Sequence, residues 1–257
     1  MSEVVIKKTK KLETVDRLLQ LLECFTLETP EWGVTELSHR LDLYKSVVHR
    51  MLSTLEGRGY VTQNSTTKKY TLGIKIFELG MVVSNQMDLR KIAKPLMDEL
   101  SQNVNETVML LVPDGLEGIC LEKVESTHSI KSTSPLGRRV PLYAGATSKM
   151  LMAYLPEDKI EKIIQDGLQK MTEKTITDPE KLREQLRTIR GEGHCITVGE
   201  YTQGSMGIAA PITNYDGDII ASLSVTGPEF RMFEQSESIL LQCKYTAAMI
   251  SQRLGTK

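Results

Sequence analysis

The sequence predicts an α+β protein with a small helical N-terminal domain and a larger second domain built on an antiparallel sheet. Its 257 residues are enough for two domains, at about 100–200 residues per domain. Apolar residues recur at helical spacing in the first 60 positions, whereas β-rich runs joined by short polar turns dominate the second half. These runs do not alternate regularly with helices, which favours an antiparallel sheet over βαβ units.

Composition narrows the class of protein further. The chain is 40 % hydrophobic and 25 % charged, which is ordinary for a globular protein and excludes collagen-like or wholly disordered architectures. A net charge of −1 argues against a protein that coats nucleic acid indiscriminately. It still allows a small DNA-reading domain, because the first 80 residues carry 12 Lys/Arg against 10 Asp/Glu and the remainder 20 against 23.

Metal and membrane signals are absent from the sequence. The four cysteines and four histidines form no C-x-x-C, H-x-H or H-E-x-x-H motif, so neither a metal nor another cofactor is expected. No stretch approaches the roughly 18 apolar residues of a transmembrane helix. The lysines within residues 1–11 precede no apolar signal-peptide core, and this segment is expected to be a basic tail. We therefore expect a cytoplasmic protein with free thiols.

The first 60 residues predict three helices. The first begins at Thr14, and the sequence Thr29–Gly33 breaks the pattern because proline disfavours helical geometry in the residue before it. Thr35 is expected to cap a short second helix that ends around Leu41–Asp42. A turn leads to a third helix starting near Lys45. The apolar positions of the first and third helices are Val15, Leu18, Leu19, Leu22 and Phe25, then Val48, Met51, Leu52 and Leu55.

A hairpin and a long helical segment follow. Residues 60–63 and 69–72 are β-prone and flank the polar turn 64–68, which predicts a β-hairpin. Helix, short helix, turn, helix and hairpin are the order of a winged helix-turn-helix, assigned to residues 12–73. The helical pattern then runs from about Ile74 to Asn103, with Pro95 as the expected break. Residues 74–94 are predicted to be a linker helix, and residues 95–257 the second domain.

The second domain mixes strands and helices. Asp178 is expected to cap a helix with proline at its first position. The predicted strands are 107–112, 118–124, 130–132, 195–198, 206–211 and 219–226, and the predicted helices are 148–155, 157–166, 179–191 and 235–254.

One face of the third helix carries the residue types that read DNA. If Val48, Leu52 and Leu55 face the core, the opposite side presents polar and basic residues. Arginine can pair with guanine edges, serine can bond phosphate or base, and valine can contact a thymine methyl. An ordinary amphipathic helix with a solvated face is the alternative, which the preceding helix and the hairpin disfavour. The candidate DNA-binding residues are Thr35, Lys45, Ser46, Val47, His49, Arg50, Lys68 and Lys69.

Several blocks of the sequence resemble those of the IclR family of bacterial transcriptional regulators. In the first domain they are Val15–Arg17, Thr35–Ser38, Lys45–Arg50 and Leu55–Val61; in the second they are Gly137–Ala144, Ser148–Ala153, Thr175–Asp178, Gly204–Pro211 and Ala221–Pro228. The resemblance runs from about residue 12 to 254. Several blocks in the family's order are a stronger signal than one short motif.

The resemblance implies a winged helix-turn-helix domain, a linker helix and a GAF-like effector-binding domain. It also implies a homodimer or dimer of dimers on double-stranded DNA, and two-fold symmetry predicts an inverted-repeat operator. By position, it implies an effector pocket lined by Leu136, Ala146, Thr147, Thr197, Gly207, Ser224 and Thr226.

The residues of this pocket favour a small organic effector, a carboxylate or hydroxylated acid. Backbone N–H groups at Ala146 and Thr147 precede a predicted helix and suit an anion. Ser224 and Thr226 alternate along a strand, so their hydroxyls share one face; a solvated sheet face is the alternative. Only Tyr143 among the aromatic residues lies near the pocket segments, which makes an aromatic ligand less expected.

The chain also departs from the family pattern. The family often has His, Gly and Cys where this sequence has Tyr143, Ser148 and Gly207, and an acidic residue near Thr197. The predicted pocket therefore lacks an evident charged or thiol anchor. The neighbouring residues 138 and 139, both arginine, are expected to face solvent.

Two other functional classes compete with a ligand-responsive transcription factor. An enzyme would need a nucleophile elbow, a phosphate loop or a dinucleotide fingerprint, and the sequence has no G-x-S-x-G, G-x-x-x-x-G-K-[ST] or G-x-G-x-x-G. A DNA-binding protein with a ligand-blind dimerisation domain stays open, because the sequence alone does not show that a ligand binds. Ligand-induced thermal stabilisation would separate these two hypotheses.

Overall fold

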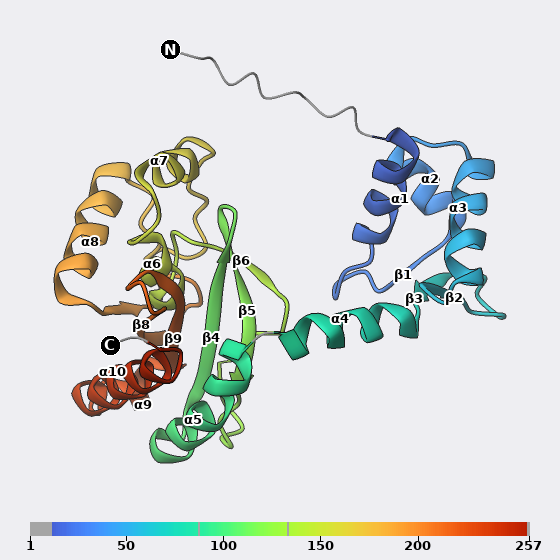
Figure 1. The fold of residues 1–257 in the computed structure, drawn as a ribbon. Coiled ribbons are helices and arrows are strands. Elements are labelled where there is room, and N and C mark those ends of the chain that lie inside the picture. The colour runs from blue at the N-terminus through green and yellow to red at the C-terminus, as the bar shows by residue number, and fades with distance from the viewer. Residues whose placement is uncertain (1–11, 87, 133, 256–257) are drawn as a thin grey trace, which may run out of the picture. The chain divides into compact units, whose positions relative to one another are not determined.

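The computed structural model describes residues 12–86, 88–132 and 134–255. The chain divides into two compact units, with the division between Gln86 and Met87 (Figure 1). The predicted basic tail, residues 1–11, lies outside the described residues. Across the described part of the chain, no helix is both long enough and apolar enough to cross a bilayer.

Unit 1 has the predicted winged helix-turn-helix order. Its helices are α1 (Glu13–Glu23), α2 (Val34–Leu41), α3 (Lys45–Gly57) and α4 (Ile74–Gln86), and its strands are β1 (Glu31–Trp32), β2 (Val61–Gln63) and β3 (Tyr70–Leu72). The strands pair antiparallel in the order β1-β3-β2. The hairpin is therefore extended by one short strand, β1, which the sequence pattern did not indicate.

The turn between α2 and α3 is fixed by two local contacts. Asp42 ends α2 in the left-handed region, with φ of 52°, a conformation that aspartate tolerates better than most residues. The Ser38 hydroxyl donates to the Leu43 carbonyl at 2.6 Å. Beneath the turn, the apolar faces of the helices meet the sheet in one core. Its buried residues are Leu21, Phe25, Leu37, Val48, Met51, Leu52, Leu55, Val61 and Tyr70.

The predicted cap of α2 is wrong by two positions. Gly33, not Thr35, precedes the helix, and the Glu36 side chain accepts a hydrogen bond from the Gly33 N–H at 2.7 Å. This bond lowers the pKa of the Glu36 carboxyl below its ordinary value. The helix begins early because β1 already brings the chain back to the core at Trp32, whose ring N–H donates to the Cys24 carbonyl.

Unit 2 is built on one six-stranded antiparallel sheet of order β6-β5-β4-β9-β8-β7. The strands are β4 (Thr107–Asp114), β5 (Glu117–Val124), β6 (Arg139–Pro141), β7 (Cys195–Val198), β8 (Ser205–Thr213) and β9 (Ile219–Pro228). The helices are α5 (Asp88–Val104), α6 (Ala146–Met152), α7 (Glu157–Gln165), α8 (Pro179–Glu192), α9 (Glu229–Met232) and α10 (Ser236–Arg253).

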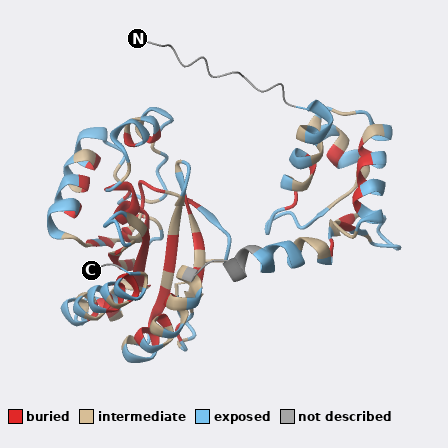
Figure 2. Cartoon of the chain, viewed as in Figure 1, coloured by how far each residue is buried: buried red, intermediate tan, exposed pale blue. Residues whose placement is uncertain are grey.

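Helices cover both faces of this sheet, and buried residues follow its strands (Figure 2). On one face, α5 and α10 pack against apolar residues such as Leu223 and Val225 of β9. On the other face, α6 packs on the sheet with α7 and α8 outside it. Successive strand residues point to opposite faces, so the intervening Ser222, Ser224 and Thr226 lie on the α6 side. Polar residues of β9 thus lie beneath α6 instead of facing solvent.

Two sequence-based expectations in unit 2 are wrong, and one is confirmed. Residues 130–132 form no strand; the Ile130 carbonyl accepts from the Arg231 side chain instead of from a neighbouring strand. Pro95 lies inside α5 and does not break it. Ala93 and Met97 are fully buried on either side of the proline, and this packing outweighs its helix penalty of about 3 kcal/mol. Asp178 caps α8 as predicted, accepting from the Lys181 N–H.

The cysteines give a test of the packing. All four are free, three are buried, and only Cys24 is partly accessible. Burial raises the pKa of Cys120 to about 11 and those of Cys195 and Cys243 to about 12. Because the thiolate is the reactive form, we expect only Cys24 to react rapidly with Ellman's reagent at neutral pH. All four thiols should react in denaturant, and rapid native reaction of Cys195 would contradict the packing beneath α6.

Candidate functional site

The predicted reading face of α3 is accessible in unit 1. Lys45, Ser46, His49 and Arg50 are exposed and Val47 is half-buried, while Val48, Met51, Leu52 and Leu55 on the other side are buried. The core therefore fixes the rotation of the helix and presents the polar and basic side chains together. Thr35 lies exposed near the start of α2.

Tyr44 is an exposed residue that sequence reasoning missed. It precedes α3 directly, at the N-cap position, and 85 % of its surface is accessible. A large aromatic side chain so exposed beside basic residues is a candidate contact to the sugar–phosphate backbone, since tyrosine hydroxyls commonly bond phosphates. Its position one residue before the helix start was the available signal.

The two lysines of the β2–β3 turn differ in their surroundings. The turn is closed by the Asn64 side chain, which accepts from the Thr66 and Thr67 N–H groups at 2.9 and 3.0 Å. Lys68 is exposed, with φ of 59°. Lys69 instead places its ammonium 3.6 Å from a Glu31 oxygen and 3.5 Å from a Glu36 oxygen. Lys68 is therefore the stronger candidate of the two for a phosphate contact.

Unit 2 contains a cavity of about 590 Å³ bounded by the sheet, the start of α6 and residues of the 131–132 and 134–138 segments. Five of the seven predicted pocket residues line it: Ala146, Thr147, Thr197, Gly207 and Thr226. Thr197, Gly207 and Thr226 converge because they are register partners on the neighbouring strands β7, β8 and β9. The volume is in the range of small-molecule sites.

The other two predicted pocket residues lie outside the lining. Leu136 is 43 % exposed. Ser224 is fully buried, and its hydroxyl oxygen accepts from the Thr147 hydroxyl at 2.7 Å. The serine therefore holds a lining residue of α6 to β9. Two residues earlier on the same strand, Ser222 Oγ is the only fully buried side-chain polar atom of the described residues without a hydrogen-bond partner.

Glycine at position 207 sets the depth of the cavity. A Cβ at this position would lie 3.2 Å from the Ala146 Cβ and 3.8 Å from Thr197 Oγ1. These contacts are tight enough that a side chain would shift α6 or intrude on the space between the strands and the helix.

Charged and aromatic residues also line the cavity, contrary to expectation. Arg138 faces solvent as expected and also lies in the lining of the cavity. Arg139 does face solvent, where it pairs with Asp114 and Glu117. Lys131, Glu200 and Tyr201 also line the cavity. The premise that only Tyr143 is an aromatic neighbour is therefore also wrong.

A buried ion pair joins the lining residue Glu200 to Lys149 of α6, which lies outside the lining. The Lys149 ammonium of α6 has no exposed surface and lies 2.5 Å from Glu200 Oε2, whose side chain is 8 % exposed. The same ammonium donates to Gln185 of α8 at 2.5 Å, and Glu200 Oε2 also accepts from the Gly145 N–H at 3.3 Å. A charged pair with little access to water is retained only where hydrogen bonds satisfy it, as they do here.

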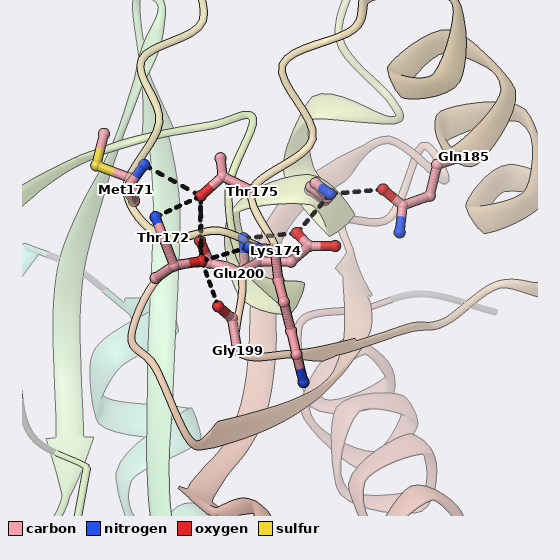
Figure 3. A network of polar contacts seen from close by, with 9 residues as sticks. Met171, Thr172, Lys174, Thr175, Gln185, Gly199 and Glu200 are labelled. Atoms are coloured by element: carbon pink, nitrogen blue, oxygen red, sulfur yellow. Dashed lines mark hydrogen bonds and ion pairs between the residues drawn. The ribbon is translucent and has the colours of Figure 1, made fainter.

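The backbone that carries Glu200 is held by a threonine clamp, defined as Thr172 and Thr175 (Figure 3). The Thr172 hydroxyl donates to the Gly199 carbonyl at 2.6 Å, and the Thr175 hydroxyl donates to the Glu200 carbonyl at 2.7 Å. Thr175 is in turn fixed by the N–H groups of Met171 and Thr172. Glu200 is thus positioned by main-chain contacts on one side and by Lys149 on the other.

The described residues contain no group of three or more His, Cys, Asp or Glu side chains that could hold a metal ion. The polar side chains that line the cavity instead carry hydroxyl groups, one carboxylate and cationic groups. Such a set suits recognition of an organic molecule by hydrogen bonds and charge.

Two family models match the chain. The IclR helix-turn-helix domain matches residues 14–65, and the bacterial transcriptional regulator IclR C-terminal domain matches residues 81–252. Together they include the helix-turn-helix and every lining residue of the cavity.

Individual proteins are similar over nearly the whole length. The regulator KipR of Bacillus subtilis is 36 % identical over 247 residues, 95 % of this chain and 98 % of KipR. The regulator XynR of Escherichia coli is 35 % identical over 217 residues, 84 % of this chain and 86 % of XynR. The crystal structure of an IclR homologue from Microbacterium hydrocarbonoxydans complexed with 4-hydroxybenzoate has a TM-score of 0.85 at 26 % identity, covering 94 % of this chain and 98 % of that one.

Proposed function

The chain belongs to the IclR family of bacterial transcriptional regulators, which bind DNA and are not enzymes, and from this we propose that a small organic acid in the unit 2 cavity controls its binding to an operator. In this proposal residues 12–73 bind DNA, residues 74–94 link the domains and residues 95–257 bind the effector, in the cytoplasm. The observation that carries it is the cavity itself, a polar-lined space of about 590 Å³ in the domain that does not read DNA.

The proposed DNA contacts follow from the accessible face of unit 1. Base edges would be read from α3 by Ser46, Val47, His49 and Arg50, while Thr35, Tyr44, Lys45 and Lys68 would contact the backbone. Lys69 remains a weaker candidate because two carboxylates already lie near its ammonium.

Exposed apolar residues of unit 1 support a homodimer. Ile74, Phe77 and Met81 lie on α4 at helical spacing and are 69 %, 63 % and 41 % exposed, and Val15 and Leu19 of α1 are half exposed. Such a stripe is typical of a surface that a second copy covers. Two recognition helices related by a two-fold axis would read an inverted repeat. A dimer of dimers remains compatible with the same surface.

The effector is proposed to be a carboxylate. Arg138 supports this, because it is a cationic residue of the cavity lining and forms no ion pair among the described residues. The Microbacterium homologue binds 4-hydroxybenzoate, an aromatic acid. Aromatic acids were less expected because only Tyr143 was thought to lie near the pocket. Tyr201 in the lining and the Microbacterium complex remove that reason.

Removing two hydroxyls tests the effector site. Ser224→Ala with Thr226→Val removes the hydroxyl that orients Thr147 and the one that faces the cavity. We expect the response of operator binding to effector to disappear, with operator affinity in its absence nearly unchanged. The measurement is an operator titration by fluorescence anisotropy with and without the acid that most stabilises the wild type. Thr213→Val, at the far end of the neighbouring strand β8, is the control. A double variant that responds at wild-type concentrations would place the site elsewhere.

The alternative function is DNA binding with a ligand-blind second domain. It predicts that no acid raises the melting temperature of unit 2, because only a ligand that binds the folded state stabilises it. The polar lining of the cavity favours effector binding over this alternative.

A further inference from the structure

We infer that Glu200 is a specificity residue of the cavity, which selects acids that carry a hydroxyl group as well as the carboxylate. This rests on the proposed function, since it assumes an acid in the unit 2 cavity. It adds a residue that the sequence blocks did not indicate and a chemical requirement on the effector.

The first argument is the free oxygen of the Glu200 carboxylate. Oε2 is engaged by Lys149 and by the Gly145 N–H. Oε1 has no hydrogen-bond partner among the described residues, and Ser222 Oγ is the only fully buried side-chain polar atom of that set without one. Oε1 is therefore not fully buried, and because Glu200 lines the cavity, we take this oxygen as the one that a ligand meets there.

The second argument is chemical. An ionised carboxylate only accepts hydrogen bonds, so a ligand meeting Oε1 must bring a donor. A donor to an ionised acceptor makes a stronger bond than a neutral pair does. A ligand that presents a methylene at this place would leave the carboxylate desolvated without a partner.

The third argument decides between a hydroxyl and an ammonium. Lys149 already balances the charge of Glu200, with its ammonium 2.5 Å from Oε2. A ligand cation at Oε1 would be repelled by this ammonium and by Arg138 in the same lining. A hydroxyl needs only the acceptor and carries no charge to be repelled. The acid group of the same ligand would pair with Arg138.

The test compares acids that differ only in their donors. The probes are gluconate, hexanoate and 6-aminohexanoate, six-carbon acids with hydroxyls, with no donor and with an ammonium, together with 4-hydroxybenzoate and benzoate. Binding to the full-length protein is measured by calorimetry. We expect at least one hydroxylated acid to bind about tenfold or more tightly than its hydroxyl-free counterpart, the effect of one hydrogen bond to a charged group.

A double variant removes the acceptor without leaving a buried charge unpaired. Lys149→Met with Glu200→Met replaces the ion pair by apolar side chains of similar length, which proteins often tolerate. The preference for the hydroxylated acid should disappear, because that acid loses its acceptor and its hydroxyl-free counterpart no longer desolvates a carboxylate. The matched control is Arg183→Met with Glu161→Met, which removes the ion pair between α8 and α7 and should keep the preference.

The outcomes separate this inference from the proposed function. Equal binding of hydroxylated and hydroxyl-free acids, tighter binding of 6-aminohexanoate, or a preference that survives in the double variant would overturn the role of Glu200 and leave an acid-responsive regulator. If no acid of the panel binds, both the role of Glu200 and the proposed acid effector fail, while operator binding by unit 1 can still be measured.

Discussion

Lys149→Met alone is expected to lower the free energy of unfolding of unit 2 by about 3–5 kcal/mol, the usual effect of removing one partner of a buried ion pair. The Glu200 carboxylate, 8 % exposed, would keep only the Gly145 N–H as a partner for Oε2. Gln185 would be deprived of its donor as well. Urea unfolding followed by circular dichroism measures the change, and the accessibility of the nearby buried Cys195 thiol reports unit 2 specifically.

The matched double variant controls for packing. Lys149→Met with Glu200→Met should regain most of this stability, because no charge is left without its partner. Lys162→Met, which breaks an exposed pair between Lys162 and Asp166 on α7, should change stability little. A single Lys149→Met variant as stable as the wild type would show that the pair is not the support described above.

Arg50→Ala is expected to reduce the discrimination between operator and random DNA by about 1–3 kcal/mol, the value of one bidentate contact to a base. Arg50 is exposed on the same face of α3 as Ser46 and His49. Because α3 is packed through Val48, Leu52 and Leu55, truncation at position 50 should leave the fold intact. Parallel titrations of operator and random duplexes at one salt concentration give the ratio.

Lys68→Ala provides the comparison for a residue that touches only the DNA backbone. It should weaken binding to all sequences alike and flatten the dependence of log K on log salt by about 0.9, the slope that one neutralised phosphate contributes. Operator discrimination that survives Arg50→Ala unchanged would place base reading outside α3. A change in discrimination with Lys68→Ala would mean that the β2–β3 turn reads more than phosphate.

The sequence predicted the helices of unit 1 well because their boundaries are local. The apolar spacing of α1 and α3 and the proline at position 30 act within a few residues. The cap of α2 was missed because Gly33 has no capping side chain of its own, and the contact is made by Glu36 three residues later. Pro95 was misjudged for a different reason: burial of Ala93 and Met97 against the sheet outweighs the local penalty.

The cavity was only partly predictable. Thr197, Gly207 and Thr226 were found from the resemblance, and strand register accounts for their meeting. Arg138 and Glu200 come from segments about 60 positions apart in sequence, and only the tertiary arrangement brings both to one lining. Both residues lie near the pocket segments in the sequence, but most Arg and Glu side chains are solvated, so neither was expected to line the cavity. Lys149 was the hardest to foresee, because lysine is rarely buried unless paired.

The absence of a side chain at Gly207 separates two properties of the site. Its φ lies outside the left-handed region, so alanine or a larger residue there meets no backbone strain, only the contact with Ala146. A side chain at position 207 would therefore shorten the cavity while Arg138 and Glu200 keep their charges and partners. In the proposed site, ligand length and ligand polarity would thus depend on different residues, so a single substitution at position 207 could select a shorter effector without first rebuilding the electrostatics of the cavity.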